Sequence, residues 1–320
     1  MPAAARKTGS SSLQMQTLIA ATPEAVWAAF TDPIHLVRWF PLQASIVPGV
    51  GGELRLFWGD TGSVWAISAW RPGQLLEVEE LHAFASKTEE IGGSELRDTS
   101  SSWRISIEQV SRLQSLVILE HFDLDASSSV RSIVSRGWQF ELLSLRYYLE
   151  RHFGRDRSTV WVRKNVNCGA GREAEIWKSL LEEESTLPGA VILEQAEIVD
   201  SPWQFAATLT TPASSLFRVK VQRVDQREVE VNLWLTAYDP SPNGLRDAQA
   251  DFEQRISRLE NVASGTSKRL AVDEAGLRSW STGTCEIGPL FHLPSRITGT
   301  PVDCSMQRRA PGIERRGDVF

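Results

Sequence analysis

The stretch AATPEAVWAAFTDPIHLVRWF, residues 20–40, decides the fold of this chain because it contains two helix starts in succession. Thr22 offers a side-chain oxygen as an N-cap, and Pro23 suits the first position of a helix. Asp32 and Pro33 repeat this pair further along. The sequence therefore predicts two short helices, one directly after the other.

Strand-like segments surround these helices. Segments in which apolar and polar residues alternate, as in half-buried strands, lie at 13–20, 53–59, 63–70, 75–83, 102–110 and 115–124. In 102–110, for example, Trp103, Ile105 and Ile107 share the inward face. The pair Gly51-Gly52 marks the turn into the sheet. Because the connections are short, we expect antiparallel pairing.

A long helix follows the last of these strands, at about residues 129–153. One apolar stripe at helical spacing runs along it, formed by Val134, Trp138, Leu142, Leu145 and Leu149. Gly137 inside this helix predicts a close approach of the sheet or a ligand to the helix backbone. The order of elements predicts an α+β fold in which a curved antiparallel sheet wraps the helix. The two short helices then close one end of an apolar cavity.

These residues resemble a known family. The matching motifs span about 140 residues and are Pro23-Glu24-x-Val26-Trp27, Phe30-Thr31-Asp32-Pro33, Arg38-Trp39-Phe40, Gly51-Gly52, and Gly137-Trp138 followed by Leu142, Leu145, Tyr148 and Leu149. The segment resembles the SRPBCC (START-like, helix-grip) superfamily, in the branch similar to the C-terminal domain of the activator of a heat-shock chaperone ATPase. The resemblance implies a helix-grip fold that holds a ligand in its cavity.

The second half repeats the order of strand, helix, strands and long helix in fewer residues. Its motif EAEIW at 173–177 is similar to EAVW at 24–27, but it lacks the Asp-Pro pair, the Arg-Trp-Phe motif and the double glycine. We interpret it as a degenerate tandem copy, and an unrelated α+β domain is the alternative. The predicted organisation is a disordered arm at 1–11, a START-like domain at 12–154, a shorter helix-grip-like domain at 155–264, and a largely disordered tail at 265–320.

Composition narrows the classes of function. The 320 residues carry a net charge of -6, which argues against a nucleic-acid binder that relies on bulk basicity. No run of 18 or more apolar residues predicts a membrane span. The three cysteines are far apart, which fits neither a disulfide framework nor a zinc site and favours a cytoplasmic setting.

Twelve tryptophans against three tyrosines indicate large mixed cores or cavities. The residues predicted to line the cavity and contact a ligand are Trp39, Leu56, Trp58, Trp103, Trp138, Leu142 and Leu145. His82 and His121 lie on predicted strands without a nucleophile or orienting partner in the sequence, so no catalytic residue is assigned. The carboxylates Glu77, Glu79, Glu80, Glu89 and Glu90 are interpreted as solvated. No metal site and no cofactor are predicted.

Three classes of function remain. The first is a soluble protein that binds a small hydrophobic or amphipathic molecule or a lipid, in stress response or lipid handling. The second is a co-chaperone-like module that binds a chaperone or another protein through its outer sheet face. The third is a cyclase- or hydrolase-type enzyme that uses the same cavity, and the lack of converging polar groups makes the sequence favour a non-enzyme.

Overall fold

The computed structural model describes residues 11–59, 61–84, 101–124, 128–181, 193–209, 214–238 and 240–263. All of the described residues belong to one compact unit. The predicted tail at 265–320 and all of the predicted arm except Ser11 lie outside the described residues.

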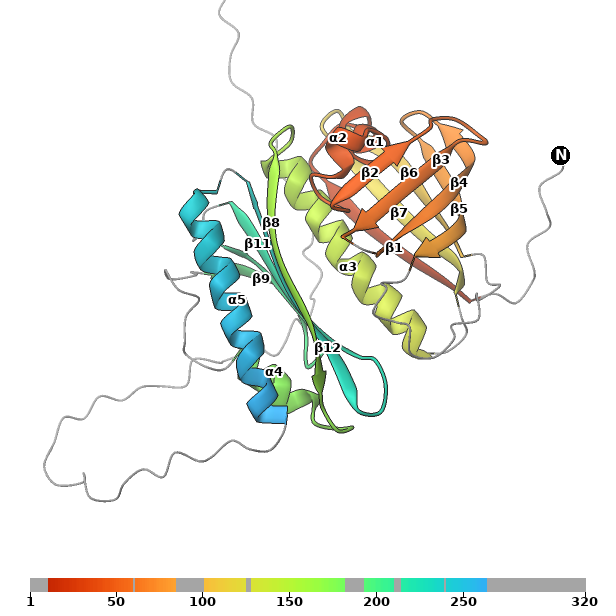
Figure 1. Cartoon of the computed structure of the whole chain (residues 1–320). Helices are drawn as coiled ribbons and strands as arrows, with labels where there is room; N and C mark the ends of the chain where they lie inside the picture. The colour runs from red at the N-terminus through yellow and green to blue at the C-terminus, as the bar shows by residue number, and fades with distance from the viewer. Residues whose placement is uncertain are drawn as a thin grey trace, which may run out of the picture. The chain divides into compact units, whose positions relative to one another are not determined.

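A seven-stranded antiparallel sheet forms the first half of this unit (Figure 1). Its strands are β1 (Ser11–Ile19), β2 (Gln43–Ile46), β3 (Glu53–Trp58), β4 (Thr61–Arg71), β5 (Leu75–Phe84), β6 (Ser102–Ser111) and β7 (Gln114–Leu124). They lie in the order β1-β7-β6-β5-β4-β3-β2. Six of these strands follow the predicted segments. The four-residue edge strand β2 was not predicted, because QASI is too short and too polar to show a clear alternation.

The two predicted helices are α1 (Pro23–Thr31) and α2 (Pro33–Leu36). The Thr22 hydroxyl oxygen accepts from the backbone N–H of Ala25 at 3.3 Å, and the Asp32 carboxylate accepts from the N–H of Ile34 at 2.8 Å. Both side chains therefore act as the N-caps that the sequence predicts. Asp32 also ends α1, and so the two helices follow each other directly.

The glycine pair has a backbone role. The N–H of Gly51 donates to the carbonyl of Ile67, and the N–H of Ile67 donates to the carbonyl of Gly52, both at 2.9 Å. Gly51 has a φ of 83°, and a Cβ at Gly52 would collide with the carbonyl oxygen of Val47. Two glycines are needed here because the turn pairs closely with β4 and also folds back on itself.

Helix α3 (Ser128–Arg151) lies against the inner face of this sheet. Of its predicted stripe, all but Val134 are buried. This α+β arrangement, an antiparallel sheet around a long helix with two short helices before it, is the predicted helix-grip fold. The sheet does not approach Gly137 closely, because no described atom beyond the helix backbone and the adjacent residues lies within 4 Å of the position of its Cβ, and the close approach of a ligand there stays a prediction.

A five-stranded antiparallel sheet forms the second half. Its elements are β8 (Arg157–Asn167), α4 (Glu173–Leu181), β9 (Leu193–Asp200), β10 (Gln204–Leu209), β11 (Ser215–Arg223), β12 (Glu228–Tyr238) and α5 (Pro242–Ala263). The strand order is β8-β12-β11-β10-β9. As in the first sheet, the first strand pairs with the last, and a long helix follows. Helices α4 and α5 cover one face with their own apolar core. The tandem duplication stays a prediction.

Helix α3 also has a second buried face, which the sequence analysis did not identify. Phe140, Leu143 and Tyr147 are buried, and they lie in one core with Leu216 and Tyr238 of the second sheet. The Tyr147 hydroxyl donates to the carbonyl of Ser215 at 3.3 Å. Burial on both sides places α3 in contact with both sheets, which positions the sites described next.

Candidate ligand-binding site

An aromatic cluster occupies the grip between the first sheet and α3. Phe40 is at its centre, with its ring centroid 5.0 Å from Trp39, 5.2 Å from Trp58 and 5.6 Å from Trp138. Trp138 continues the cluster to Trp103, at 5.8 Å between centroids. These spacings are those of packed aromatic pairs. The cluster therefore joins the short-helix end of the domain to the middle of the sheet.

Two buried indoles of this cluster, those of Trp39 and Trp138, have protein partners. The Trp39 indole N–H donates to the carbonyl of Ala29 at 2.9 Å, and that of Trp138 donates to Nδ1 of His121 at 2.9 Å. The Ser144 hydroxyl donates to the carbonyl of Trp39 at 2.8 Å. These bonds meet the polar needs of the indoles and fix the rings in place.

The structure brings the predicted ligand-binding residues into one apolar core. Trp39, Leu56, Trp103, Trp138, Leu142 and Leu145 are buried in it, and Trp58 is partly buried against it. Two of the seven also border hollows at the surface: Leu142 lines a groove beside α3, and Trp58 lines a smaller pocket described further below. Ligand contact by the seven residues stays a prediction.

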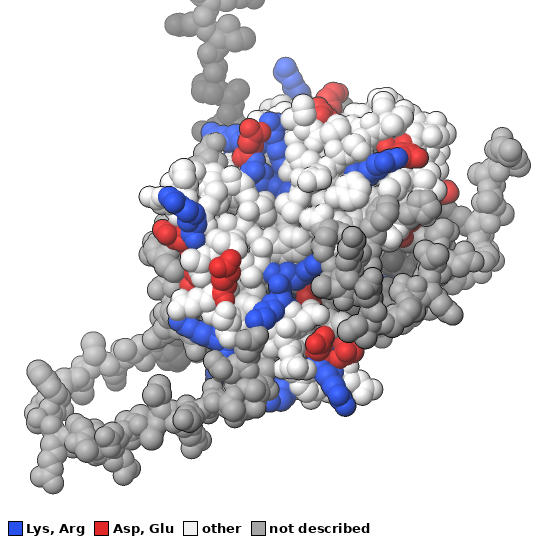
Figure 2. All heavy atoms as spheres, viewed as in Figure 1, with Lys and Arg blue, Asp and Glu red and all other residues white. Residues whose placement is uncertain are grey.

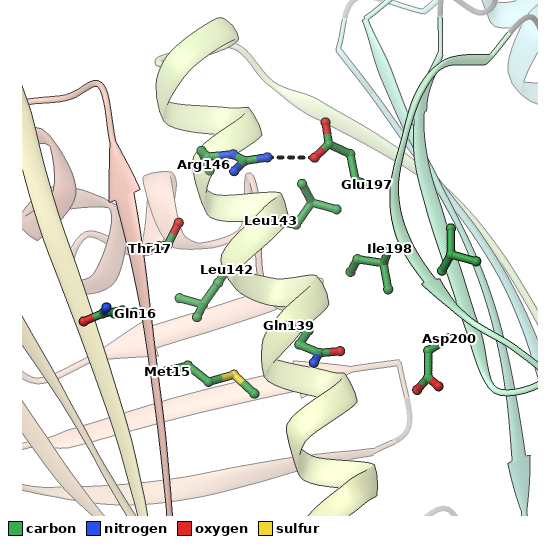
Figure 3. Close-up of a pocket in the computed structure, with 11 residues that line it drawn as sticks. Met15, Gln16, Thr17, Gln139, Leu142, Leu143, Arg146, Glu197, Ile198 and Asp200 are labelled. Atoms are coloured by element: carbon green, nitrogen blue, oxygen red, sulfur yellow. Dashed lines mark hydrogen bonds and ion pairs between the residues drawn. The ribbon is translucent and has the colours of Figure 1, made fainter. Parts of the chain in front are cut away.

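The groove beside α3 has a volume of about 730 Å³. It lies between the edge strands β1 and β9 and has α3 as its base, as Figure 3 shows. Its lining residues are Met15, Gln16, Thr17, Gln139, Leu142, Leu143, Arg146, Glu197, Ile198, Val199 and Asp200. Apolar side chains from all three elements face it, and the Arg146 guanidinium binds the Glu197 carboxylate at 2.8 Å across one end. The groove therefore has a mixed lining, in which five apolar side chains lie among polar and charged ones.

A second hollow of about 310 Å³ continues from this groove and shares Gln139 and Asp200 with it. It is more polar, because Arg131, Ser132, Ser135 and Arg136 of α3 line it. The Arg136 guanidinium is 2.6 Å from the Asp200 carboxylate. Together the two hollows form a section of mixed lining followed by a section with two arginines along one side of α3.

Polar side chains outside the aromatic cluster also have structural partners. Glu77 binds Arg104 at 2.6 Å, so it is an ion-pair partner and not the solvated carboxylate that was expected. His35 Nδ1 lies 2.6 Å from the Tyr148 hydroxyl, which joins α2 to α3. No group of three metal-ligating side chains occurs among the residues that the structure describes. The side chain of His82, together with Glu89 and Glu90, lies outside them.

The contribution of β9 to the groove was not predicted. Ile198 and Val199 lie on this strand, but nothing in their sequence pattern indicates that this edge lies beside α3. The available signal was on α3 itself, where Phe140, Leu143 and Tyr147 form a second apolar stripe at helical spacing. A helix that is apolar on two sides is expected to have two partners.

The comparisons with known proteins agree with this geometry. Residues 20–150 match the family model described as "Activator of Hsp90 ATPase homolog 1-like protein". This segment is similar to that family, and its fold is the helix-grip arrangement described above. The match ends at the C-terminal turn of α3, so it covers β2 to β7 and helices α1 to α3 but neither β1 nor the second sheet. A search of curated proteins gave no match.

Solved structures with a similar chain trace include three proteins of low identity. The Aha1 dimer from Colwellia psychrerythraea is 19% identical, covers 45% of this chain and 99% of its own, and has a TM-score of 0.38. The Hsp90 activator PFC0360w from Plasmodium falciparum is 20% identical, covers 42% and 92%, and scores 0.34. DynU16, from the dynemicin biosynthetic locus, is 12% identical, covers 80% and 98%, and scores 0.36. Scores this low add no argument to the family match.

The surface and the helices give two further observations. On the face that Figure 2 shows, basic and acidic side chains lie interspersed. Within the described ranges, no helix is both long and apolar enough to cross a membrane.

Proposed function

We propose that this chain binds a small amphipathic molecule, with the groove beside α3 as its site. The observation that carries the proposal is the groove of about 730 Å³, whose lining includes Met15, Leu142 and Leu143. Ligand sites are commonly concave and combine apolar side chains with polar groups that fix orientation, and this groove has five apolar side chains among its eleven lining residues.

The adjoining cationic hollow indicates the orientation of such a ligand. An apolar chain would lie over Met15 and Leu142, and an anionic head group would meet the guanidinium groups of Arg131 and Arg136. A single-chain fatty acid has this chemistry. The predicted contacts at the aromatic cluster belong to the same proposal, because Leu142 borders both the groove and that cluster.

Isothermal titration calorimetry with dodecanoate tests the proposal. Gln139 is exposed on α3 and lines both hollows, so Gln139→Trp fills the groove with little risk to the fold. We expect this variant to weaken dodecanoate binding by about tenfold or more, because it excludes the ligand from its apolar contacts. Gln254→Trp, at an exposed position of α5, is the matched control and should bind normally. Equal binding by both variants would contradict the proposal, as would no binding by the native chain.

A second candidate is a co-chaperone role, which the description of the matching family supports. The structural observation in its favour is a group of exposed apolar side chains near the short helices. Ile34 on α2 is 62% exposed, and Val47 and Val50 after β2 are 62% and 70% exposed. The test is the ATPase rate of an Hsp90-type chaperone with and without this chain, and an unchanged rate would reject the role.

A further inference from the structure

The face of the second sheet that is turned away from α5 is polar at its centre. Strand register places two rows of three side chains on this face, Trp161-Trp234-Arg218 and Arg163-Asn232-Lys220. Each row crosses β8, β12 and β11. Residues that pair across strands project from the same face, so the six side chains form one grid. The alternate residues, such as Val231 and Leu233, lie in the core with α5.

Helix α3 and the β3–β4 hairpin cover this grid. They contribute Phe140 and Glu141 from α3, and Trp58 and Thr61 from the hairpin, to a pocket of about 220 Å³. We call it the aromatic–cationic pocket; its remaining lining residues are the grid and Glu230. It shares no lining residue with the groove beside α3. It is therefore a separate site.

Aromatic rings surround this pocket. The indoles of Trp161 and Trp234 are 5.2 Å apart between centroids. Their N–H groups donate within the sheet, to the Asn232 amide oxygen at 3.0 Å and to the Thr236 hydroxyl at 2.9 Å. With these polar atoms satisfied, the indoles offer apolar ring surface to an occupant. Trp58 supplies a third indole from the hairpin.

The cations that line the pocket are loosely paired. Among the described lining residues, Arg218 and Lys220 lie near two carboxylates, those of Glu141 and Glu230. The ion pairs are loose, at 3.8 Å between Glu141 and Arg218 and 3.9 Å between Glu230 and Arg163. The Lys220 ammonium makes no hydrogen bond or ion pair with any residue that the structure describes. An anion is the missing partner that this arrangement indicates.

Buried donors support the same conclusion. Nε of Arg218 and Nε2 of Gln204 are buried without a hydrogen-bond partner in the described structure, although Nη2 of Arg218 donates to Oε1 of Gln204 at 2.6 Å. An unmet buried donor costs about 1–3 kcal/mol. Burial also lowers the pKa of Lys220 to about 8, with the charge of Arg218 acting in the same direction. The free protein holds these cations at a cost that a bound anion would offset.

We propose that the aromatic–cationic pocket binds a small aromatic carboxylate. Its ring lies against the indoles of Trp58, Trp161 and Trp234, and its carboxylate accepts hydrogen bonds from Lys220 and Arg218. The volume holds one small ring system and excludes a long alkyl chain, which separates this ligand class from that of the groove. The inference does not rest on the proposed function.

Calorimetric titration with indole-3-carboxylate tests the inference, with indole-3-carboxamide as the neutral probe of the same shape and inorganic phosphate as the anion without a ring. Lys220→Met keeps most of the apolar stem and removes the ammonium. We expect it to weaken binding of the acid by about tenfold or more and to leave the amide unchanged, because only the acid uses the charge-assisted hydrogen bond. Lys178→Met, at an exposed position of α4, makes the same charge change elsewhere and should have no effect.

A second variant acts in the opposite direction. Glu141→Gln removes the carboxylate that competes with the ligand for Arg218, and it should tighten binding of the acid at pH 8 several-fold. The inference is overturned if the amide or phosphate binds as tightly as the acid, if Lys220→Met binds the acid normally, or if the native chain binds none of the probes. Gln139→Trp should leave binding of indole-3-carboxylate intact, so failure of the groove proposal and failure of this one are distinguishable.

Discussion

Replacing Glu141 by glutamine should stabilise this protein at alkaline pH. Glu141 lies on α3 with a side chain that is only 15% exposed, and its ion pair with Arg218 is long, at 3.8 Å. Burial raises the pKa of the Glu141 carboxyl from its ordinary value of 4.5 to about 7, although the charges of Arg218, Arg157 and Lys220 oppose this rise. The desolvation of the carboxylate thus outweighs the attraction of the surrounding cations.

The size and sign of the effect follow from this rise in pKa. Between pH 4.5 and 7 the folded state holds a proton that the unfolded chain releases, so the free energy of unfolding falls as the pH rises through this window. Above pH 7 the free energy of unfolding is lower by the full amount, about 3 kcal/mol. Glutamine resembles the protonated carboxyl. We therefore expect Glu141→Gln to raise the free energy of unfolding by up to about 3 kcal/mol at pH 8, and by less than about 1 kcal/mol at pH 5.

Urea denaturation followed by circular dichroism at pH 5 and pH 8 measures this difference. Glu253→Gln, at an exposed position of α5, is the control for the charge change alone and should have a small effect at both pH values. If Glu141→Gln lowers stability at pH 8, the ion pair with Arg218 contributes more than burial costs, and the reasoning is wrong. An equal increase in the free energy of unfolding at both pH values would also refute this explanation, because the increase would then not come from ionisation of Glu141.

Two further predictions concern the backbone and the helix starts. Gly52→Ala should destabilise the protein by about 2 kcal/mol or more, because the new Cβ would collide with the carbonyl of Val47. Gly137→Ala should stabilise it by about 1 kcal/mol, because alanine favours the helix and its Cβ has open space there. Thermal melts of the two variants measure these changes, and changes of the same sign in both would count against the geometry. Asp32→Ala should lower the stability of the protein by about 1 kcal/mol in the same assay, because α2 loses the 2.8 Å hydrogen bond from the N–H of Ile34. If Asp32→Asn keeps the native stability and Asp32→Leu does not, the side chain acts as a helix cap.

Much of the fold could be predicted because its signals are local. Thr22 and Asp32 cap their helices through hydrogen bonds to residues two or three positions away, so a short stretch of sequence contains the whole interaction. The alternation in β6 has the predicted sense, with Trp103 and Ile105 buried. The edge strand β2 could not be predicted, because β3 makes it a strand through pairing and its own residues give no clear pattern.

The seven predicted site residues show the limit of such patterns. The sequence correctly predicts that most of them are buried, because apolar residues at strand and helix periods face a core. It does not predict how they pack against one another. Phe40 connects Trp39, Trp58 and Trp138 through ring contacts between the short helices, the sheet and α3, and these elements are distant in sequence.

By itself, the sequence determines the order of elements, the two capped helices, the glycine turn and the family resemblance, because each depends on neighbouring residues or on a short period. Only the tertiary structure decides that α3 is buried on both faces and that the polar sides of β8, β11 and β12 lie beneath it. In the sequence, Arg218 and Lys220 alternate with apolar residues as the solvent-facing side of a strand would. The physical reason is that alternation separates the two faces of a strand but does not say what covers each face. In this fold a second layer covers the polar face, and it encloses cations that the sequence pattern alone would leave in water.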